Sequence, residues 1–185
     1  MPIWSEPSLR VPTQASIRRA ATFDIAELAR IDDDAAAIYA QAGIHFDGPG
    51  IPAFAEAERK RWKVAVQCGL AELATDPAGR AIGFIALGYV DGLPYVDQIS
   101  VMHAWQRKGV GRTLLEHAIA WSQQAGELWL TTYAHLPWNA PMYARHGFVI
   151  VDDSRCGSEL SEVLIEQRAA LPCPAQRVAM VRSAR

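Results

Sequence analysis

The stretch that begins at Gln106 contains residue types that could bind a phosphate group. Gly109 and Gly111 lie among cationic side chains, and an amphipathic helix pattern runs from Val110 to Ala125. The first turn of a helix presents unpaired backbone N–H groups at the positive end of the helix dipole, and a glycine lets an anion approach them closely. The pattern therefore predicts a phosphate or pyrophosphate site. The cationic residues beside it are Arg107, Lys108 and Arg112.

A second interpretation of the two glycines is a tight turn from strand to helix on a solvated basic surface. Two well-known phosphate loops do not fit. The segment GVGRTL lacks the Gly-Lys-Ser/Thr ending of a P-loop, and Leu114 occupies the position of the third glycine of a dinucleotide fingerprint. The loop must therefore be interpreted together with its neighbours.

Composition indicates an ordinary globular protein. The chain has 185 residues, of which 50% are hydrophobic and 21% charged, so we expect one sizeable core. The formal net charge of −2 gives no general attraction for nucleic acid. The longest apolar run, residues 81–90, is too short to span a bilayer. The three cysteines and five histidines are scattered, so we expect no metal site, no disulfide framework and a cytoplasmic location. The N-terminal segment contains prolines and lacks an apolar core, so we expect no secretory signal.

The order of expected elements indicates a mixed α/β domain at residues 16–185, after an irregular, proline-containing tail at residues 1–15. We expect helices at residues 22–40 (with Thr22 as N-cap), 54–69, 110–125, 158–171 and, in short form, within 137–147. We expect strands at residues 16–20, 70–76, 81–90, 94–101, 128–133, 148–151 and 177–182.

Three segments in this order resemble the GNAT superfamily of CoA-dependent N-acyltransferases. They are the strand end ISV (99–101), the loop QRKGVG (106–111), and WNAPMYARHGF (138–148). The loop fits that family's pyrophosphate pattern of Gln or Arg, two variable residues, Gly, one variable residue, and Gly or Ala. The resemblance runs from about Ser16 to Val151, with a final strand near Val178, and it extends to a bacterial subgroup largely without assigned substrates. It implies a central, mostly antiparallel twisted sheet of about seven strands flanked by helices.

The resemblance implies acetyl-CoA as the cofactor. Backbone groups of Ile99 and Val101 would bind the pantetheine arm as an added strand does, and backbone amides from Arg107 to Arg112 would hold the pyrophosphate. Asn139 matches a CoA-contacting asparagine, although it could also be the N-cap of the short helix. The implied cofactor-binding residues are Ile99, Ser100, Val101, Gln106, Arg107, Lys108, Gly109, Val110, Gly111, Arg112, Asn139 and Tyr143.

The resemblance also implies two catalytic residues. Tyr143 matches a tyrosine that protonates the departing thiolate, with packing as the competing role. Asp97 matches the position of a carboxylate base, needed because an alkylamine is mostly protonated at neutral pH. It precedes Ile99 by two residues, so we expect both on one face, roughly 6.6 Å apart, which favours a water relay. A structural role for Asp97, such as pairing with a cation, stays open. His135 is the reserve base and His103 a weaker one.

The acceptor side is less determined. Family members build it from the loop between the first two helices and the loop after the fifth strand, which gives Tyr39, Phe46, His135 and Trp138, with His45 and Asp47 nearby. The acidic run at residues 32–34 is typical of a solvated helix face, although it could suit a cationic amine.

We therefore expect an N-acetyltransferase that moves an acetyl group to a primary amine by direct attack in a ternary complex. The expected partner is a small-molecule amine, with no nucleic acid and no membrane, and a homodimer by analogy. One alternative is a non-catalytic acyl-CoA-binding sensor, which would need neither Asp97 nor Tyr143. Another is a site for a different phosphate ligand, such as a nucleotide.

Overall fold

A single mixed sheet organises the chain in a computed structural model that describes residues 15–183. Its seven strands follow the order β1-β2-β3-β4-β5-β7-β6, and every neighbouring pair is antiparallel except β4 and β5. The predicted mixed fold is thus confirmed, whereas the predicted tail falls almost wholly outside the described residues. The strands are β1 Ser16–Arg19, β2 Ala71–Thr75, β3 Ala81–Val90, β4 Leu93–Val101, β5 Glu127–Tyr133, β6 Val149–Val151 and β7 Arg177–Ser183.

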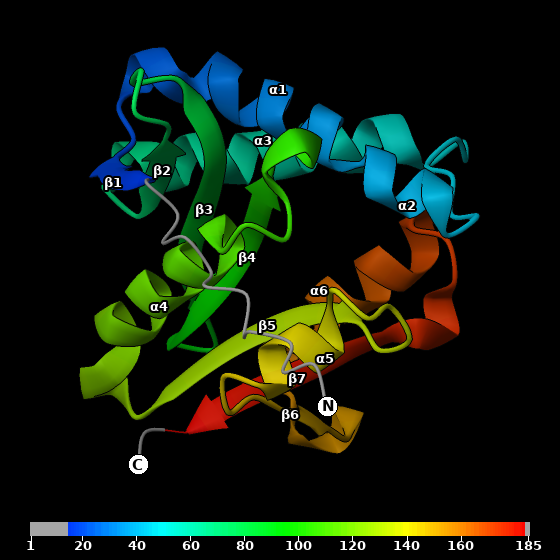
Figure 1. The fold of residues 1–185 in the computed structure, drawn as a ribbon. Coiled ribbons are helices and arrows are strands. Elements are labelled where there is room, and N and C mark those ends of the chain that lie inside the picture. The colour runs from blue at the N-terminus through cyan, green and yellow to red at the C-terminus, as the bar shows by residue number, and fades with distance from the viewer. Residues whose placement is uncertain (1–14, 184–185) are drawn as a thin grey trace, which may run out of the picture.

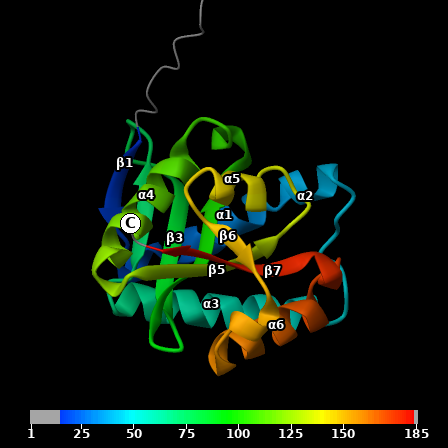
Figure 2. The same cartoon turned by 90° about the horizontal axis from the view of Figure 1, so that it is seen from below.

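Helices cover both faces of the sheet (Figure 2). The helices are α1 Ile25–Ala35, α2 Ala37–Gln41, α3 Ile51–Gln67, α4 Val110–Ser122, α5 Ala140–Ala144 and α6 Ser158–Ala170. We call the side covered by α1, α3 and α6 face A, and the side covered by α4 and α5 face B. On face A, Leu28 and Trp62 pack against Phe84, while on face B Leu114 and Tyr143 pack against Ile85 and Leu130. Helices on both sides explain why β3 is an almost continuous apolar run.

The predicted first helix begins differently from the expectation. Thr22 is not its N-cap: residues Thr22–Asp24 form a 3-10 turn, and α1 starts at Ile25. The carboxylate of Asp24 accepts the backbone N–H of Ala21 at 2.8 Å and the guanidinium of Arg18 at 2.7 Å. The acidic side chain therefore satisfies the free backbone donor that the sequence assigned to a threonine.

The two central strands separate after a short contact. Strands β4 and β5 pair only through Tyr95 with Trp129 and Val96 with Leu130, and beyond these residues they diverge (Figure 1). The divergence coincides with a bulge in β4, because Val96 pairs with Leu87 and Gln98 with Ala86, which leaves Asp97 without a partner in β3. A bulge increases the local twist of a strand, so it turns the second half of β4 away from β5.

No helix within residues 15–183 combines the length and the apolar character needed to cross a bilayer.

Gly83 is a specific requirement of the packing between α4 and the sheet. A Cβ atom at Gly83 would lie 3.1 Å from the carbonyl oxygen of Ser100 and 3.2 Å from Cγ1 of Val110. We predict that Gly83→Ala lowers the free energy of unfolding by about 1–3 kcal/mol, the usual cost of overpacking. Gly88→Ala in the same strand is the control, because a Cβ there meets nothing within 4 Å. Urea unfolding measures both, and an equal effect of the two substitutions would contradict the packing explanation.

Candidate functional site

The loop before α4 has the backbone of an anion site. Gly109 occupies the N-cap of α4 with φ +92°, and Arg107 also has a positive φ of 60°. A glycine suits this conformation, and the first-turn amides of α4 have no partners within the helix. The surrounding cations are partly engaged: Arg112 donates to Glu116 at 2.8 Å, and Lys108 lies 5.2 Å from the ring centre of Trp105. Phosphate binding by residues 107–112 remains a prediction that this geometry suits.

Gln106 has a positioning role that the sequence did not indicate. Its Nε2 donates to the carbonyl oxygen of Val101 at 3.0 Å and to that of Ala35 at 3.4 Å. The side chain therefore ties the start of the loop to the ends of β4 and α1.

The second half of β4 offers free backbone groups on the side where β5 has departed. The N–H of Met102 donates to Ile82 in β3 at 2.9 Å. Because alternate residues of an antiparallel pair direct their peptide groups to opposite sides, the groups of Ile99 and Val101 point away from β3. Since the pairing with β5 ends at Val96, these groups have no strand partner among the described residues, apart from the Val101 carbonyl bound by Gln106.

Tyr143 and Asn139 lie together at α5. Tyr143 is 7% exposed and packs edge-on against Phe148, and burial raises the pKa of its phenol, which therefore keeps its proton. Its hydroxyl has no hydrogen-bond partner among residues 15–183. Asn139 is at the N-cap of α5, but its side chain makes no capping bond; its Nδ2 instead donates to the Tyr39 hydroxyl at 3.4 Å.

Asp97 does not share a face with Ile99, contrary to the sequence-based expectation. The bulge makes Asp97 and Gln98 both point to face A, whereas Ile99 packs on face B. The Asp97 carboxylate, 12% exposed, accepts from Nε of Arg61 at 3.0 Å. Burial raises its pKa and the Arg61 charge opposes the rise. The pairing with a cation, one of the two roles left open, is thus present.

Glu58 is a second carboxylate on this face, one turn before Trp62 in α3. Its side chain is 17% exposed, and its nearest cation is Nη2 of Arg61 at 3.7 Å. Burial raises its pKa to about 8, the charges of Asp32 and Asp97 add to the rise, and Arg61 and Arg177 oppose it. A weakly paired carboxylate with this pKa can exchange protons near neutral pH.

The acidic run at residues 32–34 is a solvated helix face only in part, because Asp33 and Asp34 are exposed whereas Asp32 is half-buried. Asp32 accepts from the Ser100 hydroxyl and from Nε2 of Gln98, each at 2.6 Å, and burial raises its pKa. Asp33 pairs with Arg59 at 3.2 Å. Asp34 accepts the backbone N–H of His103 at 2.6 Å. The run therefore fastens α1 to β4 and α3, because all three side chains meet donors from neighbouring elements.

The predicted acceptor residues gather around Tyr39. Its ring centre lies 5.2 Å from that of Phe46 and 6.1 Å from those of Trp138 and Tyr133. His135 is exposed and meets the ring of Tyr133 edge-on at 5.7 Å. The structure thus brings the four predicted residues to one cluster, in which Tyr133 is an additional member.

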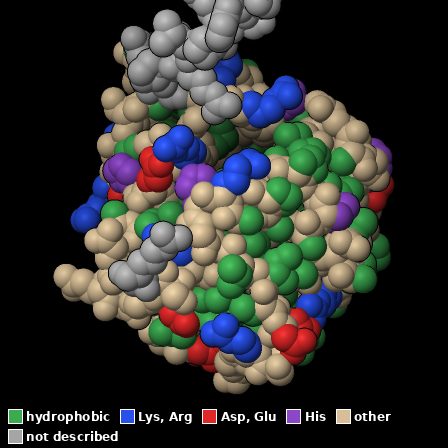
Figure 3. Space-filling view, turned by 60° about the horizontal axis from the view of Figure 1, so that its bottom comes forward, with side chains coloured by type: hydrophobic (Ala, Val, Ile, Leu, Met, Phe, Trp, Pro, Cys, Tyr) green, Lys and Arg blue, Asp and Glu red, His purple; other side chains and the backbone are tan. Residues whose placement is uncertain are grey.

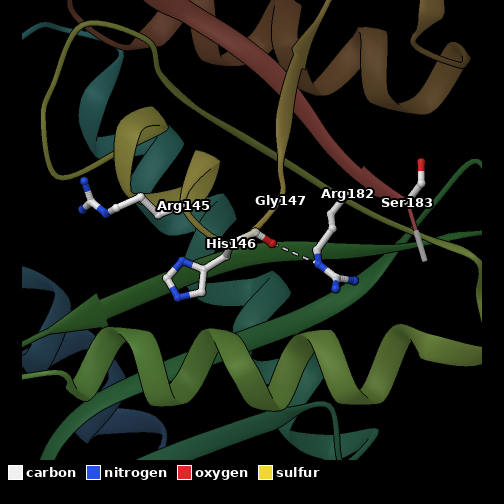
Figure 4. Close-up of a pocket in the computed structure, with 5 residues that line it drawn as sticks. All are labelled: Arg145, His146, Gly147, Arg182 and Ser183. Atoms are coloured by element: carbon white, nitrogen blue, oxygen red, sulfur yellow. Dashed lines mark hydrogen bonds between the residues drawn. The ribbon is translucent and has the colours of Figure 1, made fainter. Parts of the chain in front are cut away.

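Two surface hollows lie at the end of α5. One is lined by Arg145, His146, Gly147, Arg182 and Ser183, and Nε of Arg182 donates to the His146 carbonyl at 3.0 Å (Figure 4). The other is apolar and lined by Ala134, Ala140, Pro141, Ala144, Phe148, Val149, Ile150 and Met180, and Figure 3 shows hydrophobic side chains gathered on the face it belongs to. Neither hollow includes a predicted site residue. The described part of the chain contains no group of His, Cys, Asp or Glu suited to a metal ion.

Sequence reasoning missed Glu58, Arg61 and Arg177. The available signal for Glu58 is its position one turn before Trp62, which places a carboxylate on the apolar side of a helix. Arg61 follows Glu58 by three residues and shares that side. Arg177 gives no signal, because an arginine at the start of an apolar strand is usually a surface residue.

Part of the chain matches a known protein family. Residues 64–150 match the family model of the acetyltransferase (GNAT) domain. The fold is similar to that of N-acetylglutamate synthase from Neisseria gonorrhoeae, solved with coenzyme A and N-acetyl-glutamate (TM-score 0.66, 16% identity, 92% of this chain). The chain spans only 35% of that protein. It spans 98% of the PaiA N-acetyltransferase from Thermoplasma acidophilum, solved with coenzyme A (TM-score 0.65, 17% identity, 91% of this chain). It spans 99% of a GNAT-family acetyltransferase from Staphylococcus aureus Mu50 (TM-score 0.66, 14% identity, 92% of this chain).

The raised pKa of Glu58 predicts a pH-dependent effect on stability. A carboxyl group whose pKa rises from 4.5 to about 8 on folding favours the folded state below pH 4.5, and this contribution is lost as pH rises to 8. Glu58→Gln should therefore unfold like wild type at pH 4.5 and become more stable than wild type by up to about 1.4 kcal/mol per pH unit toward pH 8.

Denaturant unfolding across this pH range measures the difference. Glu56→Gln on the same helix is the control, because the Glu56 side chain is 60% exposed. A difference between Glu58→Gln and wild type that does not change with pH would contradict the raised pKa.

Proposed function

We propose that the chain is a GNAT-type N-acetyltransferase that moves an acetyl group from acetyl-CoA to a primary amine. The match of residues 64–150 to the acetyltransferase (GNAT) domain and the fold similarity to the PaiA N-acetyltransferase support this proposal. One observation carries the proposal. The free backbone edge of β4 at Ile99 and Val101 leads directly into the glycine-containing loop that opens α4.

This edge and loop fit acetyl-CoA in chemistry. Peptide groups of Ile99 and Val101 would take up the amide-bearing pantetheine arm as an added strand, and the first-turn amides of α4 would take up the pyrophosphate. A Cβ atom placed on Gly111 would lie 3.5 Å from Cγ2 of Val101, so the start of α4 lies against the end of β4. The bound thioester supplies an activated acetyl carbonyl with a thiolate leaving group.

Glu58 is the carboxylate best suited to accept a proton from the acceptor ammonium group. Asp97, the residue predicted from the sequence, is engaged by Arg61 at 3.0 Å, whereas Glu58 has only the 3.7 Å contact. A base works best with a pKa near the working pH, and the pKa of Glu58 is raised to about 8. In this assignment the pair of Asp97 and Arg61 holds α3 against β4.

The transfer then proceeds in one complex. The neutral amine nitrogen attacks the thioester carbonyl carbon, the C–N bond forms and the C–S bond breaks. The Tyr143 hydroxyl gives its proton to the departing thiolate and regains one from the former amine nitrogen. Glu58 releases the first proton to solvent, so the products are the amide, the CoA thiol and one proton. A covalent intermediate is not part of the proposal, since Cys68 and Cys173 are exposed and Cys156 belongs to the α6 core.

The first prediction concerns acetyl-CoA binding. Gly109→Val should weaken binding at least about tenfold, because a branched side chain cannot keep φ +92° and the N-cap must rearrange. Gly79→Val is the matched control: Gly79 also has a positive φ of 79° with open space around it, but it lies in the turn between β2 and β3. Calorimetric titration with acetyl-CoA measures the affinities of wild type and both variants. An absence of binding by wild type would refute the proposal.

The second prediction concerns the base. With an amine found by thiol-release screening, wild-type kcat/KM should rise with pH to an inflection about pH 8. Glu58→Gln should lose this inflection and fall about 100-fold at pH 7. Asp97→Asn should keep the inflection and move it to lower pH, because one negative charge is removed and Arg61 becomes free to pair with Glu58. The reverse result for the two variants would assign the base to Asp97.

A further inference from the structure

Arg177 is a buried cation without an acidic partner. The residue is 8% exposed, and its Nη2 donates to Oε1 of Gln167 at 2.6 Å and to Oγ1 of Thr131 at 3.2 Å. Its Nε is buried and finds no acceptor among residues 15–183. The centre of the Tyr133 ring lies 4.8 Å from Cζ of Arg177, and this cation–π contact partly stabilises the buried charge. A buried charge is costly unless it is paired, so this guanidinium is incompletely satisfied.

Several other arginines of the chain have carboxylate partners, whereas the half-buried Arg182 donates to the carbonyl oxygen of His146. Arg18 pairs with Asp24 at 2.7 Å, Arg61 with Asp97 at 3.0 Å, and Arg168 with Asp153 at 2.5 Å. Arg177 is more deeply buried than these and makes no such pair within the described chain. The deep burial of Arg177 without an acidic partner points to an anion that is not part of the protein.

The position of Arg177 joins it to the proposed reaction. It is the first residue of β7 and pairs with Tyr133 at the end of β5, beyond the point where β5 leaves β4. Its charge opposes the rise in the pKa of Glu58, of Tyr39 and of Tyr143, so it lies within electrostatic reach of the proposed base, the aromatic cluster and the proton donor.

We propose that Arg177 binds a carboxylate of the acceptor, and that the acceptor is an amino acid, a primary amine that also carries a carboxylate. This inference rests on the proposed acetyl transfer and deepens it by naming the substrate class. The ammonium group of the acceptor faces Glu58 and its carboxylate faces Arg177, so one acid and one cation fix the two ends of a zwitterion. The carboxylate is unchanged by the reaction, and only the nitrogen gains the acetyl group.

The test compares amino acids with their carboxamides, which keep the amine and lose the negative charge. Thiol release from acetyl-CoA is followed for the standard L-amino acids and β-alanine, each beside its amide. Wild type should prefer the acids by about 10- to 100-fold in kcat/KM, the usual weight of a hydrogen bond to a charged group. Arg177→Gln should abolish this preference, and Arg177→Lys, which keeps a charge in the core, should reduce it.

Arg61→Gln is the matched control, because Arg61 lies on the same face but already has Asp97 as its partner. Its acid-to-amide preference should equal that of wild type. Equal use of acids and amides by wild type would overturn the inference and leave acetyl transfer standing. An equal loss of kcat for acids and amides in Arg177→Gln would also overturn it, because Arg177 would then act on charge that develops during the reaction.

A binding measurement separates failure of this inference from failure of the proposed function. If no amine of either kind is acetylated, glycine and glycinamide are titrated into the protein while the ¹⁵N-labelled Nε–H signal of Arg177 is followed by NMR. The signal is identified by its absence in Arg177→Lys. A shift with glycine alone supports the carboxylate site independently of catalysis, and no shift with either probe rejects it.

Discussion

The separation of β4 from β5 is the constraint on which the rest of the structure depends. Two strands that pair through only two residues on each side leave backbone donors and acceptors uncovered in the middle of a sheet, where such groups are normally paired. The fold can tolerate this opening because the remaining pairs are extensive: β3 with β4 and β5 with β7 run along most of their lengths. The uncovered edge therefore lies between two stable halves, and the loop before α4 and the side chains of face A are arranged around it.

Charge on face A is distributed unevenly. Helix α3 supplies both Glu58 and Arg61, and the guanidinium of Arg61 is closer to Asp97 than to Glu58. Asp97 and Arg61 thus balance each other, whereas Glu58 and Arg177 keep incomplete partners. Burial penalises each of these groups separately, so keeping both incompletely paired is a cost to folding, which a bound molecule with a cationic group for Glu58 and an anionic group for Arg177 would offset.

Much of this architecture follows from local patterns. The spacing of apolar residues predicted the strands and most helices to within a few residues, but the single helix predicted at residues 22–40 is divided into a 3-10 turn, α1 and α2. Gly109 and Gly147, with positive φ values of 92° and 88°, lie before α4 and shortly after α5, where the turn signals indicated helix boundaries. What local patterns could not predict depends on contacts between distant elements. Asp32 reads as a surface residue until Gln98 and Ser100 come within hydrogen-bond distance. The direction of Asp97 depends on a pairing irregularity that its neighbours in sequence do not encode, and the environment of Arg177 is built from β5 and α6.

The bulge at Asp97 makes the opening sensitive to chain length. Val96, before the bulge, points to face B, and Gln98, after it, points to face A. Their partners Leu87 and Ala86 are consecutive in β3. A chain without Asp97 could continue the pairing of β4 with β3 without a break, and all remaining side chains of β4 would keep their present faces. Such a strand would lose the extra twist that directs it away from β5. In an alignment of related sequences, an open and a closed form of this sheet would therefore differ by a gap of one position, which a comparison of residue types would not detect.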